Sequence, residues 1–248
     1  MQEDDRIENE IKHGVFVARQ GEQAWNWSSP AGKKRWQRRV NLFCSFLGNN
    51  DKNVLEIGCG TGLFTAELVK TRNKITAIDI SPNLISIAQQ RIGNKALFFL
   101  LNAYDTNFPN NFFDFVIGSS VLHHLDVDSA IKEFYRILKP NGGFMFTEPN
   151  MLNPQIFLQK NIPFIKKMAG DSPDETAFIR WFLSRKLLHA GFNDVAVTPF
   201  DFIHPSVPEF LLGYLENSLY FLERIPLMKE FAGSLIITAN KPTRDFHE

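Results

Sequence analysis

The chain lacks the features that would place it outside the cell or in a membrane. Its two cysteines, Cys44 and Cys59, are too few for a disulfide framework, so we expect free thiols. No apolar run approaches the roughly 20 residues that span a bilayer. The first five residues are polar and acidic, unlike a signal peptide. These absences predict a cytoplasmic protein without a membrane span.

The sequence also lacks a charge bias, internal repeats and Cys/His clusters with the spacing of metal ligands. Its 27 basic residues balance 27 acidic ones, so it predicts no general nucleic-acid-binding surface. We therefore expect neither a bound metal nor a nucleic-acid partner. A chain of 248 residues is long enough for one α/β domain with a large core.

Residues 54–62, Val-Leu-Glu-Ile-Gly-Cys-Gly-Thr-Gly, are the most informative segment. Their apolar start predicts a buried parallel strand, and residues 63–70 predict the helix that follows the glycine turn. Glycines let the backbone approach a ligand closely, and the start of a helix offers free N–H groups. The segment predicts a cradle for a nucleotide-type cofactor.

The spacing of the three glycines distinguishes between cofactors. Gly58, Gly60 and Gly62 form Gly-x-Gly-x-Gly after an acid, Glu56, and not the Gly-x-Gly-x-x-Gly of pyrophosphate binding. That carboxylate would repel two phosphates but tolerate a sulfonium and an α-ammonium group. Asp79 ends the next predicted strand, where α/β sites hold ribose hydroxyls. We expect Ser81-Pro82 to cap the following helix and to leave Asp79 free for a ligand.

In these motifs the chain resembles the class I S-adenosylmethionine-dependent methyltransferases. The resemblance implies S-adenosyl-L-methionine as cofactor and a Rossmann-like α/β fold. That fold has a seven-stranded, mostly parallel sheet with helices on both faces, and an antiparallel last strand between the fifth and sixth. It also implies a set of cofactor-binding residues: Glu56, Gly58, Cys59, Gly60, Gly62, Asp79, Ile80, Asn102, Ala103 and Ser119.

Two further strands fit the resemblance. Residues 97–101 are all apolar and predict a strand buried on both faces, ending at Asn102-Ala103. Asn102 would meet the adenine amino group, with Asp105 as the alternative if the register is shifted. Residues 112–118 resemble the fourth strand, after which Ser119 begins the segment over the methionine part of the cofactor.

The chain divides into three parts of one structural domain. Residues 1–50 are a leader and a cap helix, residues 51–150 are the cofactor-binding core, and residues 151–248 complete the sheet. We expect the leader, up to about Ile11, to be poorly ordered. Residues 30–48 predict a helix, and the resemblance places Arg39 on it near the methionine carboxylate. Trp27, in the preceding loop, could close over the cofactor or the substrate.

Two insertions in the last part, residues 150–175 and 205–230, contain many apolar side chains. We expect helical lids near the carboxyl ends of the strands, where α/β folds bind ligands. Such a lid predicts a small or medium-sized, partly apolar acceptor. A homodimer interface is the rival explanation for the same side chains.

The catalytic candidates follow from the chemistry of methyl transfer. If the acceptor is a hydroxyl, a base helps to remove its proton, and histidine suits that role near pH 7. His124 is the first candidate and follows the predicted fourth strand, whereas we expect His123 to pack or to cap a helix. Glu148 and His204 also end predicted strands on the pocket side. An acceptor that is already a nucleophile would need no base.

Other functions remain open at this point. A nucleic-acid or protein methyltransferase and a non-catalytic S-adenosylmethionine-binding protein are the alternatives. The neutral charge argues against a nucleic-acid methyltransferase. The amino-methylating enzymes of that class carry an Asn/Asp-Pro-Pro-aromatic tetrapeptide after the fourth strand, and this chain has Ser119-Ser120-Val121-Leu122 there instead. Tyr135 and Lys139 have the spacing of a short-chain dehydrogenase pair. We expect them to pack and to cap a helix instead.

Overall fold

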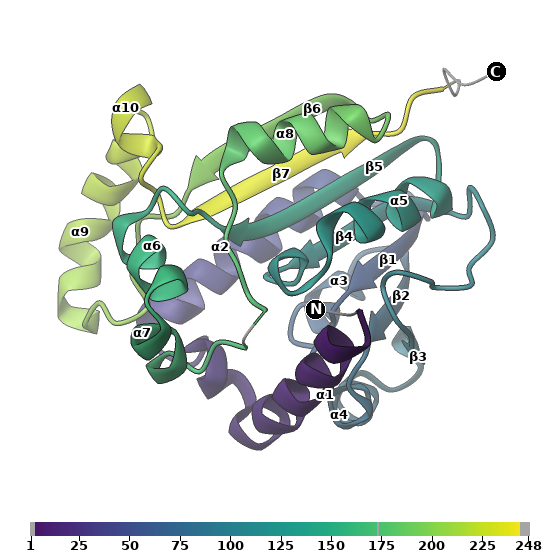
Figure 1. Cartoon of the computed structure of the whole chain (residues 1–248), viewed down its shortest axis with the longest axis horizontal. Coiled ribbons are helices and arrows are strands. Elements are labelled where there is room, and N and C mark those ends of the chain that lie inside the picture. Colours follow the sequence, from purple (N-terminus) through teal and green to yellow (C-terminus); the bar gives the residue numbers. More distant parts are fainter. Residues whose placement is uncertain (1–2, 173, 244–248) are drawn as a thin grey trace.

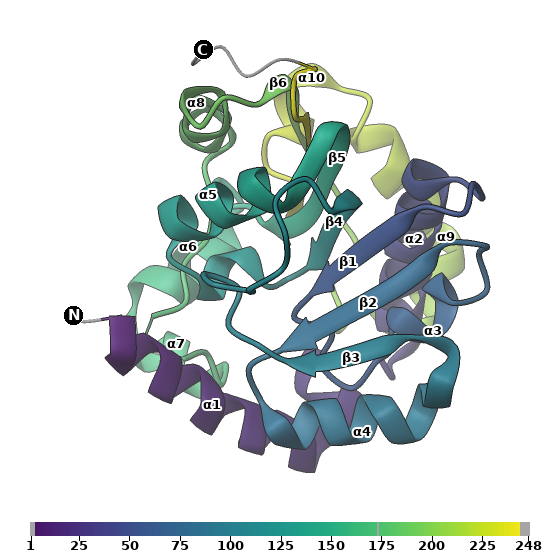
Figure 2. The same ribbon diagram turned by 90° about the vertical axis from the view of Figure 1, so that its right-hand side faces the viewer.

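A seven-stranded sheet forms the centre of the molecule. The computed structural model describes residues 3–172 and 174–243, without the side chains of residues 3, 4, 24, 25 and 216. The strand order is β3-β2-β1-β4-β5-β7-β6. Only β7 runs antiparallel to its neighbours, which confirms the predicted fold (Figures 1 and 2). The strands are β1 Asn53–Ile57, β2 Lys74–Asp79, β3 Leu97–Leu100, β4 Phe113–Ser119, β5 Leu138–Pro149, β6 Asn193–Phe200 and β7 Ser234–Asn240.

Helices cover both faces of the sheet (Figure 2). Along β1, Val54 packs toward α2, α3 and α4, whereas Leu55 and Ile57 pack toward α5 and α8, because successive side chains of a strand point to opposite faces. The helices are α1 Glu3–Gln20, α2 Pro30–Leu47, α3 Thr65–Leu68, α4 Pro82–Ile92, α5 Val127–Ile137, α6 Pro154–Asn161, α7 Pro163–Met168, α8 Arg180–His189, α9 Glu209–Leu222 and α10 Pro226–Lys229. None of the described helices has the length and hydropathy of a membrane span.

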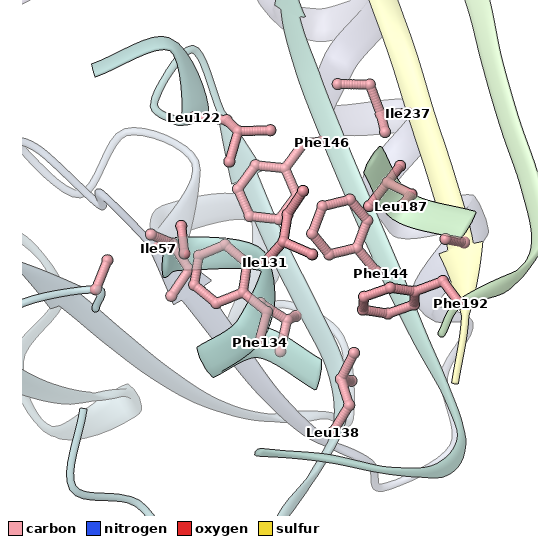
Figure 3. Packing of buried hydrophobic residues seen from close by; sticks show 14 of the residues in the cluster. Ile57, Leu122, Ile131, Phe134, Leu138, Phe144, Phe146, Leu187, Phe192 and Ile237 are labelled. Atoms are coloured by element: carbon pink, nitrogen blue, oxygen red, sulfur yellow. The ribbon is translucent and has the colours of Figure 1, made fainter. Parts of the chain in front are cut away.

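Aromatic side chains fill the core between the sheet and α5 (Figure 3). Phe134 of α5 stacks on Phe146 of β5 at 5.5 Å between ring centres, and Phe144 stacks on Phe146 at 4.6 Å. All three are fully buried. Truncating any one to alanine would cost roughly 3–5 kcal/mol of stability. This rigid core fixes the strand ends that carry the site.

The capping signals in the sequence correspond to observed helix starts. The side chains of Ser29 and Ser81 accept hydrogen bonds from backbone N–H groups of α2 and α4, each with proline in the first turn. Gly48 and Gly93 follow the same two helices with positive φ angles. The predicted helix over residues 30–48 is therefore confirmed as α2.

Several expected elements differ in the structure. The helix expected over residues 63–70 is shortened to α3, because turns occupy residues 61–64. Strand β3 is not buried on both faces: Leu97 is 62 % exposed and Leu100 is 53 % exposed. It is the outermost strand, so no further strand covers it. Lys139 does not cap α5 and pairs with Asp114 at 2.9 Å.

The N-terminal segment is the largest departure from the prediction. Of the residues expected to be a poorly ordered leader, those from Glu3 onward belong to helix α1, Glu3–Gln20, and residues 1–2 lie outside the described residues. This helix packs along α4 and crosses the carboxyl ends of the strands (Figure 2). It therefore covers the place where an α/β fold binds its ligand.

Candidate active site

The glycine turn after β1 has the conformation that its sequence demands. Gly58, Gly60 and Gly62 have φ angles of 64°, 54° and 76°, which favour glycine. A Cβ atom on Gly58 would lie 2.4 Å from the side chain of Val121. The absence of side chains therefore keeps this backbone open toward a ligand and close to the next loop.

Asp79 joins the end of β2 to the glycine turn. Its Oδ2 accepts a hydrogen bond from the Gly60 N–H and its Oδ1 accepts one from the Ser81 N–H, each at 2.9 Å. The carboxylate is thus less free than the sequence suggested, although Ser81 does cap α4 as expected. Burial raises the pKa of Asp79 and outweighs these hydrogen bonds. Asp79 still faces the pocket with the lone pairs that remain.

A pocket lies between the glycine turn, the ends of β1, β2 and β4, and helix α1. Ile57, Ile78, Ile80 and Leu101 give it apolar walls, which suit a flat ring. The backbone of the glycine turn and the buried carboxylate of Asp79 suit the polar part of a nucleoside. Nine predicted cofactor residues line it: Trp27, Gly58, Cys59, Gly60, Asp79, Ile80, Asn102, Ala103 and Ser119.

Three predicted cofactor residues do not line this pocket. Glu56 accepts a hydrogen bond from the Thr65 hydroxyl at 2.7 Å, and burial raises its pKa to about 8. Gly62 packs against α4. Arg39 pairs with Asp201 at 2.7 Å and is buried on the inner face of α2. Asp105, the alternative to Asn102, is exposed and also lies outside the pocket.

Helix α1 supplies pocket residues that the sequence analysis missed. They occupy one face of the helix: Arg6, Ile7, Glu10, His13, Gly14 and Val17. Their recurrence every three or four residues is the spacing of one helical face. That periodicity was the available signal, but the polar composition of the segment favoured a disordered leader.

Glu148 is not a base candidate in this structure. Its Oε1 accepts hydrogen bonds from the backbone N–H groups of Val121 and Leu122, at 3.0 and 2.8 Å. Its Oε2 lies 2.7 Å from Nδ1 of His123. The carboxylate is fully engaged in holding the loop after β4, and it does not line the pocket. Burial lowers the pKa of His123, so His123 donates Nδ1–H to Glu148 as a neutral ring.

His124 occupies a different environment from its neighbour. Its Nδ1 lies 2.9 Å from Glu10 of α1 and 3.7 Å from Glu175. Burial lowers the pKa of His124, but the two carboxylates outweigh it and raise the pKa overall. Both ion pairs use Nδ1, which leaves Nε2 as the nitrogen available to an acceptor proton.

Comparisons with known proteins agree with this geometry. The methyltransferase domain family matches residues 55–146. The demethylmenaquinone methyltransferase of Staphylococcus epidermidis is 26% identical over 239 residues, covering 87% of this chain and 97% of that protein. The enzyme of the same name from Geobacillus stearothermophilus is 27% identical over 208 residues, covering 73% of this chain and 84% of that protein.

Solved structures share the fold. Phosphoethanolamine N-methyltransferase 2 of Haemonchus contortus, in complex with S-adenosyl-L-methionine, has a TM-score of 0.65 at 19% identity. The match covers 93% of this chain and 60% of that chain. An S-adenosylmethionine-dependent methyltransferase of Thermotoga maritima has a TM-score of 0.64 at 19% identity and covers 92% of this chain and 99% of that chain. Together, the domain match, the relatives and the shared fold indicate a class I S-adenosylmethionine-dependent methyltransferase.

The methyltransferase has a second cavity, of about 370 Å³, beside the cofactor pocket. The first insertion contributes Asn153, Gln155 and Lys160, and the segment after β6 contributes Phe202 and His204. His204 lies in this wall only, where its Nε2 is 2.7 Å from the Gln155 amide nitrogen. Four residues line both cavities: His13, Trp27, Ser120 and His124.

The methyltransferase also contains a cluster that the sequence did not reveal. One donor atom each of His123, His124 and Glu175 lies within 4.8 Å of the other two, a spacing that could hold a metal ion. Lys160 Nζ, however, lies 2.7 Å from both Glu175 and Asp171. The lysine already supplies a positive charge to that carboxylate. We therefore assign the cluster to charge balance around His124.

Proposed function

We propose that this methyltransferase transfers a methyl group to a small or medium-sized acceptor held in the second cavity, with His124 as the base. The observation that carries the proposal is the position of His124 in the walls of both cavities. A methyl donor and its acceptor must meet in line for the transfer. The shared wall is where two bound molecules would approach each other.

The cofactor pocket suggests a role for each residue. Bound S-adenosylmethionine supplies an electrophilic methyl group on a sulfonium. Asp79 would accept hydrogen bonds from the ribose hydroxyls, Asn102 would bind the adenine amino group, and Ile80 would pack on the adenine face. The amide oxygen of Asn102 already accepts from the Tyr104 N–H at 3.0 Å, which fixes its orientation.

The second cavity supports an acceptor that is only partly apolar. Trp27, Phe202 and Ile203 offer apolar surface, while Asn153, Gln155 and their polar neighbours offer hydrogen bonds. The relatives named demethylmenaquinone methyltransferases support an acceptor with a quinone or phenol ring. A ring bearing hydroxyl groups matches both kinds of surface and gives His124 a proton to remove.

We propose, too, that the chain forms a homodimer through its second insertion. Phe210 and Tyr214, one turn apart on α9, are 72 % and 83 % exposed and do not line the second cavity. The aromatic side chains expected to line a lid thus face outward here. Contiguous exposed apolar surface of this kind is typical of an interaction site.

Replacement of His124 tests the proposed base. His124→Ala should lower the rate of methyl transfer to a phenol or quinol by a factor of about 10²–10⁴, the usual contribution of a general base. The wild-type rate should rise with pH as the imidazolium loses its proton, with a midpoint above the ordinary pKa of histidine. In the variant this rise should disappear. The measurement is acceptor-dependent formation of S-adenosylhomocysteine across the pH range.

His189→Ala is the matched control. His189 is exposed on α8, away from both cavities, so its loss should leave the rate and the pH profile unchanged. A His124→Ala protein that transfers methyl groups at the wild-type rate with an unchanged pH profile would remove His124 from the mechanism.

A further inference from the structure

Three arginines of α2 meet two carboxylates beside the second cavity. Arg38 pairs with Glu223 at the end of α9 through two hydrogen bonds, one of 2.6 Å. That pair is neutral by itself. Arg35 and Arg39 both turn to Asp201, which follows β6 and is 1 % exposed.

Arg35 and Arg39 both donate to the same oxygen. Oδ2 of Asp201 accepts from Arg35 Nε at 2.9 Å and from Arg39 Nη1 at 2.7 Å. Two guanidinium groups therefore share one carboxylate. With Arg38 and Glu223 neutral together, the cluster retains one positive charge that none of its members balances.

Arg39 is almost fully enclosed, with 3 % of its side chain exposed, although it too lines the second cavity. Its Nη2 donates to the Ser234 hydroxyl at 2.7 Å, and the rings of Trp27 and Phe200 lie 5.4 and 5.0 Å from its guanidinium carbon. Burial, aided by the nearby charge of Arg35, lowers its pKa to about 10, in spite of Asp201. Arg35, the more exposed of the two arginines in the cavity wall, is therefore the one that a partner for the excess charge can reach.

Arg35 has both the exposure and the free donors to receive such a partner. Its side chain is 15 % exposed and lines the second cavity. Only its Nε is used by Asp201, and its two Nη groups make no hydrogen bond to any residue within 3–172 or 174–243. The other acids in the cavity wall, Asp171 and Glu175, are paired with Lys160.

We propose that Arg35 binds an anionic group of the acceptor, a carboxylate or a phosphate, at the end of the second cavity. This inference rests on the proposed function, since it assumes that the cavity holds the acceptor. A guanidinium presents parallel N–H donors that match the oxygens of a carboxylate or phosphate. An anion here would balance the unpaired charge of the cluster, and it would fix which end of the acceptor faces His124.

The test is a binding experiment on the full chain saturated with S-adenosylhomocysteine. Calorimetry compares benzoate and phenyl phosphate with the neutral benzyl alcohol. At least one of the two anions should bind ten times more tightly than the alcohol. Arg35→Gln should abolish that preference, and Arg35→Lys should retain part of it. The tighter of the two anions distinguishes a carboxylate acceptor from a phosphate acceptor.

Lys33→Gln provides the matched control, since Lys33 is exposed on the same helix and lines neither cavity. It removes the same charge and should keep the anion preference. Equal binding of anions and alcohol, or an unchanged preference in Arg35→Gln, overturns the inference. So does weaker binding of S-adenosylmethionine to Arg35→Gln, because the anion would then be the cofactor's own carboxylate.

Failure of the proposed function has a different signature. If His124→Ala transfers methyl groups normally while the anion preference still depends on Arg35, the assignment of the base is wrong and the anion site stands. Melting temperatures of the Arg35 variants confirm that each protein is folded before binding is compared.

Discussion

Glu56, the acid before the glycine turn, has a structural role. Glu56 and Ile57 are adjacent in β1, so their side chains point to opposite faces of the sheet. Ile57 lines the cofactor pocket, whereas Glu56 meets Thr65 at the start of α3. The carboxyl group ties the end of the strand to the helix that follows the turn. Glu56 therefore supports the glycine turn and is not among the residues that line the pocket.

The raised pKa of Glu56 makes stability depend on pH. Its folded pKa of about 8 lies above the unfolded value near 4.5, so the folded state binds more protons between these two values. The stability that this proton gives is complete below about pH 4.5 and is lost as the pH rises through 8. Glu56→Gln keeps an acceptor for Thr65 and cannot ionise. Relative to the variant, the wild type should lose a few kcal/mol of unfolding free energy between pH 5 and 8.5, at about 1.4 kcal/mol per pKa unit.

Urea denaturation at a series of pH values measures this difference. Asp79, whose pKa is also raised, contributes to both proteins and cancels in the comparison. Parallel stability curves for the two proteins would show that the Glu56 carboxyl is ionised in the folded state.

Individual site residues were predictable where their role depends on the local backbone. Gly58, Gly60 and Asp79 lie where the strand–turn–helix pattern placed them, because strand ends and turns are set by nearby sequence. Arg39 was not, because its position depends on Asp201, which is 162 residues away. The alternation of side chains along β1 would by itself have predicted that Glu56 points away from the pocket that Ile57 faces.

At the scale of elements, α1 shows how tertiary contacts order a polar segment. Asn9 donates to Asp174 at 2.9 Å, Glu10 accepts from the Ser172 hydroxyl at 2.7 Å, and Gly14 packs on Ser81 at the start of α4. None of these partners is close in sequence. The polar composition of the segment was therefore misleading, since most helical stability comes from such packing.

Gly14 sets how closely α1 approaches the cofactor pocket. A Cβ atom at this position would lie 2.5 Å from Cβ of Ser81, so Gly14→Ala must push the helix outward. Because α1 forms one wall of the pocket, affinity for S-adenosylmethionine should fall about tenfold, within the 1–3 kcal/mol typical of overpacking. Calorimetric titration with the cofactor measures the loss.

Gly213→Ala on α9 is the matched control, because nothing lies within 4 Å of the added methyl group. Alanine should stabilise that helix by about 0.5–1 kcal/mol and leave cofactor affinity unchanged. Wild-type affinity in Gly14→Ala would mean that α1 does not form part of the binding site.

At the scale of the whole molecule, the sheet and the insertions differ in how far sequence determines them. The sheet was predictable because five segments match, in order, those of the methyltransferase family, and that resemblance implied the arrangement of the strands. The insertions were predictable only as apolar helices. Whether an apolar side chain faces a cavity, the core or the surface depends on neighbours that their own sequence does not specify, and most aromatic side chains of α9 face outward.

The exposed face of α9 leads to a prediction about assembly. Sedimentation should show a dimer of the wild-type chain, and the double substitution Phe210→Ser with Tyr214→Ser should shift it to a monomer. Both side chains are mostly exposed in one chain, so unfolding of the monomeric unit should change by no more than about 0.5 kcal/mol.

Phe182→Ser on α8 is the control, since Phe182 is also exposed, at 62 %, but lies on a different helix. It should leave the dimer intact. A wild-type protein that sediments as a monomer at every concentration would contradict the proposed interface.

The pairing of Glu10 with His124 has a consequence for the catalytic cycle. The spent cofactor must leave after every transfer, from a pocket of which α1 forms one wall. His124 pairs with Glu10 of α1 and lines the second cavity, so we expect a movement of α1 during cofactor exchange to displace the proposed base. We therefore expect turnover to alternate between an open and a closed form of the enzyme. The methyl donor should bind before the acceptor, and S-adenosylhomocysteine should leave last.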